Sequence, residues 1–237
     1  MNNRNDFNIS NNLSFFNENM MGPNSVLMLE ELLCNINLKP GMKILDLGCG
    51  KGLTSIFLAK KYNVNVFAVD LWIKAEENFE RFKNLNVDDL VVSINSDAMN
   101  LPFSKNYFDA VISIDSYHYF GNNDIYFNKF LRPLLKKDAL VIIAFPGMKY
   151  EVHKNIPEEM KKFWNEEALE MWHSIDWWKP KFSNYLNNFV IKELNCFDEA
   201  WNDWLKSDNE YAIDDKLMIE IDNGKYMNLI GITGKNI

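Results

Sequence analysis

The sequence predicts an α/β protein: a doubly wound, seven-stranded, mostly parallel sheet with helices on both faces and a helical insertion after the fifth strand. Two observations carry this prediction. Short apolar runs alternate with helical stretches between residues 44 and 145, which is typical of a parallel sheet covered by helices. A glycine-rich turn joins the first of these runs to the first of these helices. The 237 residues suffice for one such domain.

The N-terminal elements follow in order along the chain. A helix begins at Asn24 or Ser25, either of which can cap it, and Lys39-Pro40-Gly41 ends it. Helical spacing then predicts a helix over 71–85 that places Phe79 and Phe82 on one face. The remaining predicted elements of this part are strands at 44–47, 64–69, 90–94, 108–114 and 139–145, and helices at 53–62 and 124–135.

The pattern changes after Pro146. Residues 147–186 show helical charge patterning, and two further strands, 189–194 and 226–233, flank a helix that holds Trp201 and Trp204. We therefore expect a single domain over residues 1–237. Its parts are N-terminal covering helices (1–37), a ligand-binding core (38–146), a lid or substrate-facing insertion (147–186) and the final strands (187–237).

The charge balance restricts the possible partners. Lys and Arg number 25 against 33 Asp and Glu, a net charge of −8. Such a chain lacks the basic surface that nucleic acids and anionic membranes require. No apolar stretch reaches the length of a membrane span. The three cysteines are scattered, which suits a reducing compartment. We expect a cytoplasmic monomer or homodimer that binds neither nucleic acid nor membrane.

The strongest motif is Asp46-Leu47-Gly48-Cys49-Gly50-Lys51-Gly52, between the first predicted strand and helix. Its glycines allow a ligand to approach backbone N–H groups at the helix start. Asp70 ends the second strand, where a doubly wound fold places a carboxylate that binds ribose hydroxyls. Leu53 replaces the third glycine of the dinucleotide fingerprint, and Asp46 would repel a pyrophosphate but suits an ammonium group. S-adenosylmethionine is therefore favoured over NAD.

Residues 44–52 resemble motif I of the class I S-adenosylmethionine-dependent methyltransferases, which have a Rossmann-like fold. The segments 101–103 and 108–113 are similar to that family's passage into the fourth strand, although Lys137-Asp138-Ala139 replaces the usual glycines before the fifth. The core also resembles cyclopropane-fatty-acid-synthase-like proteins. Over residues 38–145, the resemblance implies S-adenosyl-L-methionine as cofactor. The cofactor-binding residues that we predict are Asp46, Gly48, Cys49, Gly50, Gly52, Asp70, Leu71, Trp72, Asp97, Ala98 and Asp115.

The acceptor is expected beyond the carboxyl end of the fourth strand. Asp115, Tyr117 and His118 lie in the sequence that follows it, and we predict that they form the catalytic site. His118 titrates near neutrality and is the candidate general base, while helix capping is the structural alternative. Asp115 is a candidate ligand of either the cofactor or a cationic acceptor.

The insertion carries four tryptophans, Trp164, Trp172, Trp177 and Trp178, which either pack in the core or form an aromatic wall of the acceptor pocket. We expect His153 and His173 to lie on its surface, and no metal site.

The predicted function is methyl transfer to a small-molecule acceptor at N, O, S or C. Three alternatives stay open: methylene transfer to lipid, as in cyclopropane-fatty-acid synthases; a non-catalytic, cofactor-binding regulator; and an NAD-dependent oxidoreductase. Leu53 disfavours the last of these.

Overall fold

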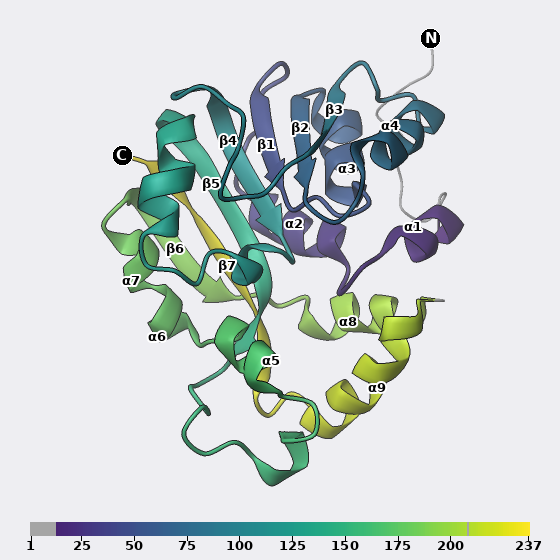
Figure 1. The fold of residues 1–237 in the computed structure, drawn as a ribbon, viewed down its shortest axis with the longest axis vertical. Coiled ribbons are helices and arrows are strands. Elements are labelled where there is room, and N and C mark those ends of the chain that lie inside the picture. Colours follow the sequence, from purple (N-terminus) through teal and green to yellow (C-terminus); the bar gives the residue numbers. More distant parts are fainter. Residues whose placement is uncertain (1–12, 208) are drawn as a thin grey trace.

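The computed structural model describes residues 13–207 and 209–237, so the first part of the predicted N-terminal covering segment, residues 1–12, lies outside the described residues. They form a seven-stranded sheet in the order β3-β2-β1-β4-β5-β7-β6 (Figure 1). The strand β7 runs in the opposite direction to the other six strands, which all run the same way. The predicted mostly parallel, seven-stranded sheet is therefore confirmed. The strands are β1 (Lys43–Leu47), β2 (Asn65–Asp70), β3 (Val91–Asn95), β4 (Phe108–Ile114), β5 (Leu135–Met148), β6 (Leu186–Glu193) and β7 (Met227–Asn236).

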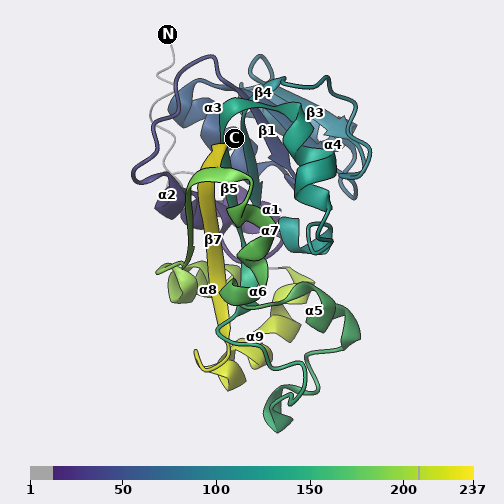
Figure 2. The same cartoon turned by 90° about the vertical axis from the view of Figure 1, so that its left-hand side faces the viewer.

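Helices cover both faces of the sheet (Figures 1 and 2). Those described are α1 (Leu13–Asn19), α2 (Ser25–Leu33), α3 (Leu53–Tyr62), α4 (Ala75–Asn84), α5 (Glu166–Met171), α6 (Ile175–Trp178), α7 (Pro180–Ser183), α8 (Phe197–Leu205) and α9 (Glu210–Asp222). Single 3₁₀ or π turns are η3 (Tyr117–Tyr119), η4 (Phe127–Leu131), η5 (Arg132–Leu134) and η6 (Glu158–Met160).

The strands separate two hydrophobic cores, because successive side chains of a strand point to opposite faces. On β1, Ile44 packs into one core and Leu45 into the other. The first core contains α1, α2, α3 and residues of α8 and α9. The second contains η4, α6 and α7. This double burial explains why the strands read as continuous apolar runs in the sequence.

Several element boundaries differ from the sequence prediction. Asn24 caps α2 as expected, its Oδ1 accepting from the amides of Val26 and Leu27 at 3.2 and 3.1 Å. By contrast, α4 begins at Ala75, four residues after the predicted start. The amides of Trp72 and Ile73 donate to the Asp70 carboxylate instead, which keeps the preceding residues in a turn. Phe79 is 44% exposed and does not share the buried face of α4 with Phe82.

Two stretches predicted as single helices are divided. The stretch 124–135 contains only a π turn and a 3₁₀ turn, and Pro133 within it cannot supply an amide to a regular helix. The stretch between β6 and β7 holds two helices, α8 and α9, where one was expected.

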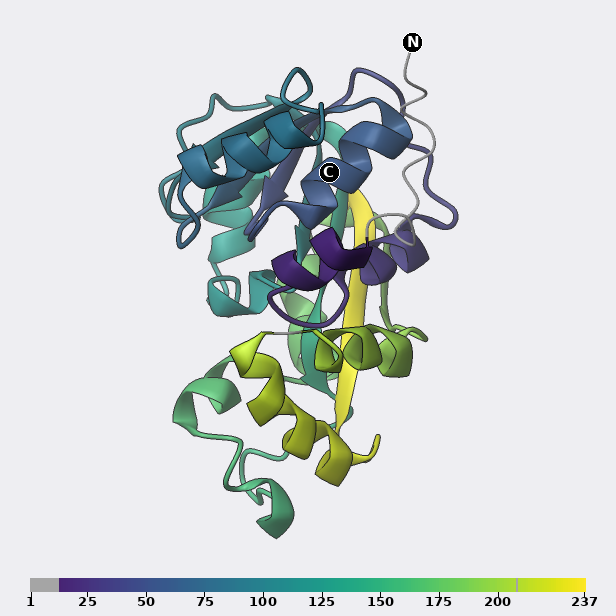
Figure 3. The same ribbon diagram turned by 90° about the vertical axis from the view of Figure 1, so that its right-hand side faces the viewer.

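Residues after β5 project beyond the carboxyl edge of the sheet. Strands β5 and β7 pair over nine residue positions and extend past β1 and β4 (Figures 1 and 2). Beyond that edge lie α5, α8 and α9, with α8 and α9 next to α1 and α2 (Figure 3). Within the described ranges, no helix has the length and apolarity needed to cross a bilayer.

Candidate active site at the carboxyl edge of the sheet

The glycine loop between β1 and α3 is locked onto the end of β2. The amides of Gly48 and Cys49 donate to the Val69 carbonyl at 2.8 and 3.0 Å. Gly48 has φ +72°, and a Cβ added there would overlap the side chain of Ser116. The Ser116 hydroxyl itself donates to the Leu47 carbonyl at 2.8 Å. The first glycine is therefore required both for the left-handed turn and for contact with the segment after β4.

Asp70, at the end of β2, organises the surrounding backbone. Its Oδ2 accepts from the Gly50 amide at 2.8 Å, and its Oδ1 accepts from the amides of Trp72 and Ile73 at 2.8 and 2.9 Å. A carboxylate has about four acceptor positions on its two oxygens. Asp70 therefore fixes the glycine loop and the turn before α4 and still has acceptor capacity for a ligand.

Asp46 does not face the ligand space, which corrects the prediction of a direct cofactor contact. The side chain is buried below the loop, with Oδ2 accepting from the hydroxyls of Thr54 and Ser55 at 2.7 and 2.6 Å. Burial raises the pKa of this carboxyl to about 6, the two hydroxyls oppose the rise and Asp70 adds to it. Asp46 thus positions the first turn of α3.

Two adjoining cavities, of about 90 and 190 Å³, open above the loop. Because five residues line both, the two cavities lie side by side along the carboxyl edge of the sheet, and we refer to them together as the trough. The shared walls are Gly48, Asp70, Trp72, Ser116 and Tyr119. The smaller cavity is also lined by Cys49, Gly50 and Asp115, and the larger by Leu71, Asp97 and Ala98. The structure thus brings together most of the residues predicted to bind a cofactor.

The larger cavity is lined by apolar and aromatic side chains that suit a flat ring. Leu71 and Ala98 supply apolar surface, and Trp72 packs edge-on against Tyr119 with ring centroids 5.1 Å apart. Trp72 is 65% exposed, so it lines the trough and does not pack in the core. Asp97 accepts from the Met99 amide at 2.8 Å, which fixes the turn after β3.

The segment between α1 and α2 closes the smaller cavity. Residues 19–23 contribute to its wall. Arg81 Nε donates to Asn19 Oδ1 at 3.0 Å, and Lys51 Nζ donates to the Glu18 carbonyl at 3.0 Å. A Cβ added to Gly22 would overlap the Asp115 carboxylate. A glycine at position 22 therefore lets this segment lie directly against the end of β4.

Asp115 follows β4 with φ +56° and lines the smaller cavity. Its carboxyl group has no hydrogen bond or ion pair to any residue that the structure describes. Burial raises the pKa of Asp115 well above its usual range, and the charge of Asp215 raises it further. A ligand cation is the group that would offset both effects.

Tyr117 and His118 do not reach the trough, which corrects their placement beside the acceptor. Tyr117 is fully buried in the second core, packed against Phe145, Trp178 and Phe182. His118 is also buried, and burial lowers the pKa of its imidazolium to about 3. Both residues lie in η3, whose tight turn directs only the neighbouring Tyr119 outward.

Gly52 has a structural role, whereas Cys49 lines the smaller cavity. Gly52 caps α3 with φ +82°, and a Cβ there would overlap the Phe82 ring. Cys49 lines the smaller cavity, but burial raises the pKa of its thiol well above the usual range, and Asp46 and Asp70 raise it further. Cys49 is thus a small wall residue without thiolate character.

The four tryptophans of the insertion line neither of the two cavities. Trp164 and Trp178 are buried in the two cores, and Trp172 and Trp177 are partly buried. Ser116 and Gly22 were not among the residues predicted from the sequence. Their roles depend on contacts between β4 and distant segments, for which a single sequence carries no signal.

Comparison with known proteins agrees with this geometry. Residues 44–137 match the family described as Methyltransferase domain. Phosphoethanolamine N-methyltransferase 1 of Zea mays is 27% identical over 203 residues, which make up 78% of this chain and 38% of that protein. The chain therefore spans less than half the length of this curated relative.

Solved structures show the same fold. The phosphoethanolamine N-methyltransferase 2 of Haemonchus contortus, in complex with S-adenosyl-L-methionine, aligns with a TM-score of 0.73 and 19% identity over 92% of this chain and 54% of that one. The geranyl diphosphate C-methyltransferase of Streptomyces coelicolor A3(2) aligns with a TM-score of 0.70 and 16% identity, over 90% of this chain and 80% of that one.

Proposed function

Because the core of the chain belongs to the class I S-adenosylmethionine-dependent methyltransferases, we propose that the protein transfers a methyl group from S-adenosylmethionine to a small-molecule acceptor. The products are S-adenosylhomocysteine and the methylated acceptor. The observation that carries the proposal is the pair of adjoining cavities over the glycine loop, one of them lined by the Asp115 carboxyl, which has no partner among the described residues. A trough of this kind suits a ligand with a flat ring at one end and a charged group at the other.

The residues along the trough fit the parts of this cofactor. Leu71, Asp97 and Ala98 line the larger cavity, where the adenine would lie. Asp70 would accept hydrogen bonds from the ribose hydroxyls, since its oxygens are already oriented by three backbone amides. The methionine part would extend over Gly48 and Gly50 into the smaller cavity. This arrangement is consistent with the absence of a fingerprint glycine at position 53.

A sulfonium methyl group is already activated, so the chain's own task is alignment of the acceptor and exclusion of water. Tyr119 and the segment 19–23 border the end of the trough at which the acceptor would enter. Burial and the nearby Asp115 raise the pKa of Tyr119, so its phenol is a neutral hydrogen-bond donor. Asp115 lines the same cavity, and its carboxyl group would pair with the cationic group of either the cofactor or an amine acceptor.

We include the insertion 147–186 in the proposal as a cover on the acceptor side. Asn122, after β4, donates through Nδ2 to the Glu170 carbonyl in α5 at 3.3 Å. Glu167, also in α5, raises the pKa of Tyr119. We further propose that the chain acts in the cytoplasm as a monomer or homodimer. Light scattering of the purified protein tests the oligomeric state.

Calorimetric titration tests the cofactor assignment. We expect micromolar binding of S-adenosylmethionine and S-adenosylhomocysteine and no binding of NAD. Binding of NAD alone would overturn the interpretation of the loop. Transfer of a labelled methyl group to pooled small amines, with phenols as the comparison pool, then tests turnover. Tight cofactor binding without transfer to either pool would favour the non-catalytic alternative.

A further inference from the structure

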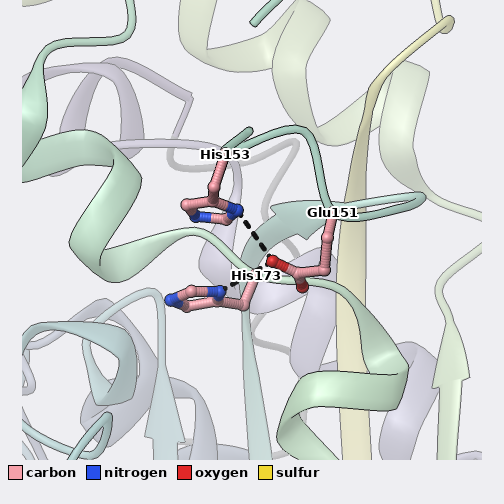
Figure 4. Close-up of side chains that lie close together, drawn as sticks. All are labelled: Glu151, His153 and His173. Atoms are coloured by element: carbon pink, nitrogen blue, oxygen red, sulfur yellow. Dashed lines mark hydrogen bonds and ion pairs between the residues drawn. The ribbon is translucent and has the colours of Figure 1, made fainter. Parts of the chain in front are cut away.

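The insertion brings together three side chains with metal-ligating atoms, at a distance from the trough. Glu151 and His153 follow the end of β5, and His173 precedes α6 (Figure 4). Nδ1 of His153 lies 2.7 Å from Oε2 of Glu151, and Nδ1 of His173 lies 3.0 Å from the same oxygen. We expected no metal site and two surface histidines in the insertion, and 20 positions separate these histidines in the sequence. The fold places both imidazoles on one carboxylate oxygen.

The tautomer of His153 leaves a lone pair in the centre of this cluster. Its Nε2 lies 2.7 Å from the Leu169 carbonyl oxygen. A carbonyl oxygen only accepts, so Nε2 carries the proton and Nδ1 of the neutral ring does not. Nδ1 is shielded from solvent and has no hydrogen-bond partner, although Glu151 Oε2 is only 2.7 Å away. Either a metal ion or a proton on Nδ1 would satisfy both atoms at this separation.

Nδ1 of His173 and Oε2 of Glu151 lie within hydrogen-bond distance of each other, at 3.0 Å. Further contacts hold the three groups in place without using these ligating atoms. Glu151 uses its other oxygen, Oε1, to accept from the Ser174 amide at 2.6 Å. The His173 ring stacks on Trp177, with centroids 3.6 Å apart and an angle of 4° between the planes. The His153 ring is nearly parallel to that of His173 at 4.4 Å. Such outer contacts, above all a carbonyl on the second ring nitrogen, orient metal-binding histidines.

The donor set indicates the class of metal. Two imidazole nitrogens and one carboxylate oxygen favour divalent transition metals over magnesium and calcium, which prefer oxygen ligands. With metal–ligand distances of about 2.1 Å, separations of 2.7 and 3.0 Å correspond to angles near 90° at the metal. The Glu151 side chain is 39% exposed, so water can complete the coordination shell.

We propose that Glu151, His153 and His173 bind one divalent transition-metal ion of the zinc, cobalt or nickel class. The ion would join the chain just after β5 to the chain just before α6. It would thereby fix both ends of the segment 154–172. The ion has no part in methyl transfer in this proposal, since none of its ligands lines either cavity.

A metal-binding measurement on the full chain tests this site, after treatment with EDTA and removal of any histidine tag. Titration with Co²⁺, followed by competition with Zn²⁺, is expected to show one ion per chain, with the absorption bands of cobalt bound to nitrogen and oxygen. His173→Phe keeps a ring that stacks on Trp177 but removes a ligand. Glu151→Gln keeps an acceptor for Ser174 but removes the charge.

We expect each variant to bind Zn²⁺ at least about 10- to 100-fold more weakly than the wild type. Losing a residue that only hydrogen-bonds to a metal ligand already weakens metal binding by about this factor. Glu166→Gln, an exposed change in the same segment, is the control and should bind as the wild type does. Zn²⁺ should also raise the melting temperature of the wild type and slow proteolysis of the segment 154–172, and do neither in His173→Phe. No binding by the wild type at 100-micromolar metal, or unchanged binding by both variants, would show that a proton on His153 is the cation instead.

Discussion

Replacement of Asp70 by asparagine changes the charge at the centre of the trough with little change in size. In the wild type, Oδ1 accepts from the amides of Trp72 and Ile73, and Oδ2 accepts from the amide of Gly50. The asparagine oxygen can retain the first two bonds. Its NH₂ group, however, would face the Gly50 N–H donor to donor, so the contact that fixes the glycine loop is lost.

Two quantities should therefore fall. A hydrogen bond to a charged group contributes about 1.5–3 kcal/mol, so we expect the free energy of unfolding to drop by about 2 kcal/mol. The ribose hydroxyls would lose a charged acceptor of the same kind. We therefore expect the cofactor's binding free energy to weaken by about 2–3 kcal/mol. That corresponds to roughly 30- to 150-fold weaker affinity.

Calorimetry with S-adenosylhomocysteine measures the affinity, and urea unfolding measures the stability. Asp138→Asn is the matched control, because this exposed aspartate has φ +61°, which asparagine adopts readily. The control should bind as tightly as the wild type. If Asp70→Asn bound within about threefold of the wild type with a stoichiometry near one, the assignment of Asp70 to the ribose would be refuted.

Three further predictions concern other parts of the site. The pKa of Asp46 rises from 3.8 to about 6 on folding, so the folded state binds more protons in that window and loses stability as pH rises through it. Relative to Asp46→Asn, the wild type should lose up to about 3 kcal/mol between pH of about 4 and 7, as measured by urea unfolding at both pH values; a constant difference would contradict this. Tyr117→Phe should keep its activity and gain up to about 1 kcal/mol in free energy of unfolding, since the buried hydroxyl has no partner among the described residues; a large loss of activity would show that Tyr117 belongs to the catalytic site. Gly22→Ala should weaken binding of S-adenosylhomocysteine about tenfold or more, because its methyl group would displace the Asp115 carboxylate. Gly41→Ala, where the added methyl meets nothing, is the control: calorimetry should show unchanged affinity, although its φ of +80° costs about 1 kcal/mol of stability.

Local patterns were sufficient wherever a residue's environment depends on its near neighbours along the chain. The apolar runs at 44–47 and 108–114 predicted strands because a doubly covered parallel strand must be apolar on both faces. The spacing of Gly48 and Asp70 predicted the trough because the carboxyl ends of neighbouring parallel strands meet at one edge. For the same reason Leu71, Asp97 and Ala98 line the larger cavity, while their contact with a cofactor stays a prediction.

The direction of a side chain in a tight turn was not predictable in the same way. Tyr117, His118 and Tyr119 are adjacent in one 3₁₀ turn, yet only Tyr119 lines the trough. The Asp46 carboxylate turns away from the cavities because two hydroxyls of α3 donate hydrogen bonds to it. The direction in which each side chain of a turn points depends on where the surrounding structure leaves space. Here the packing of the second core determines where that space is.

The sequence by itself thus determined the sheet, the glycine loop and the ligand edge of this protein, because periodicity and turn chemistry act over a few residues. Only the tertiary structure decided which groups meet across long separations. Gly22 lies against Asp115, and His153 and His173 lie on Glu151, because strand order and helix packing close these distances. No local pattern encodes such contacts, since each partner taken alone is an ordinary loop residue.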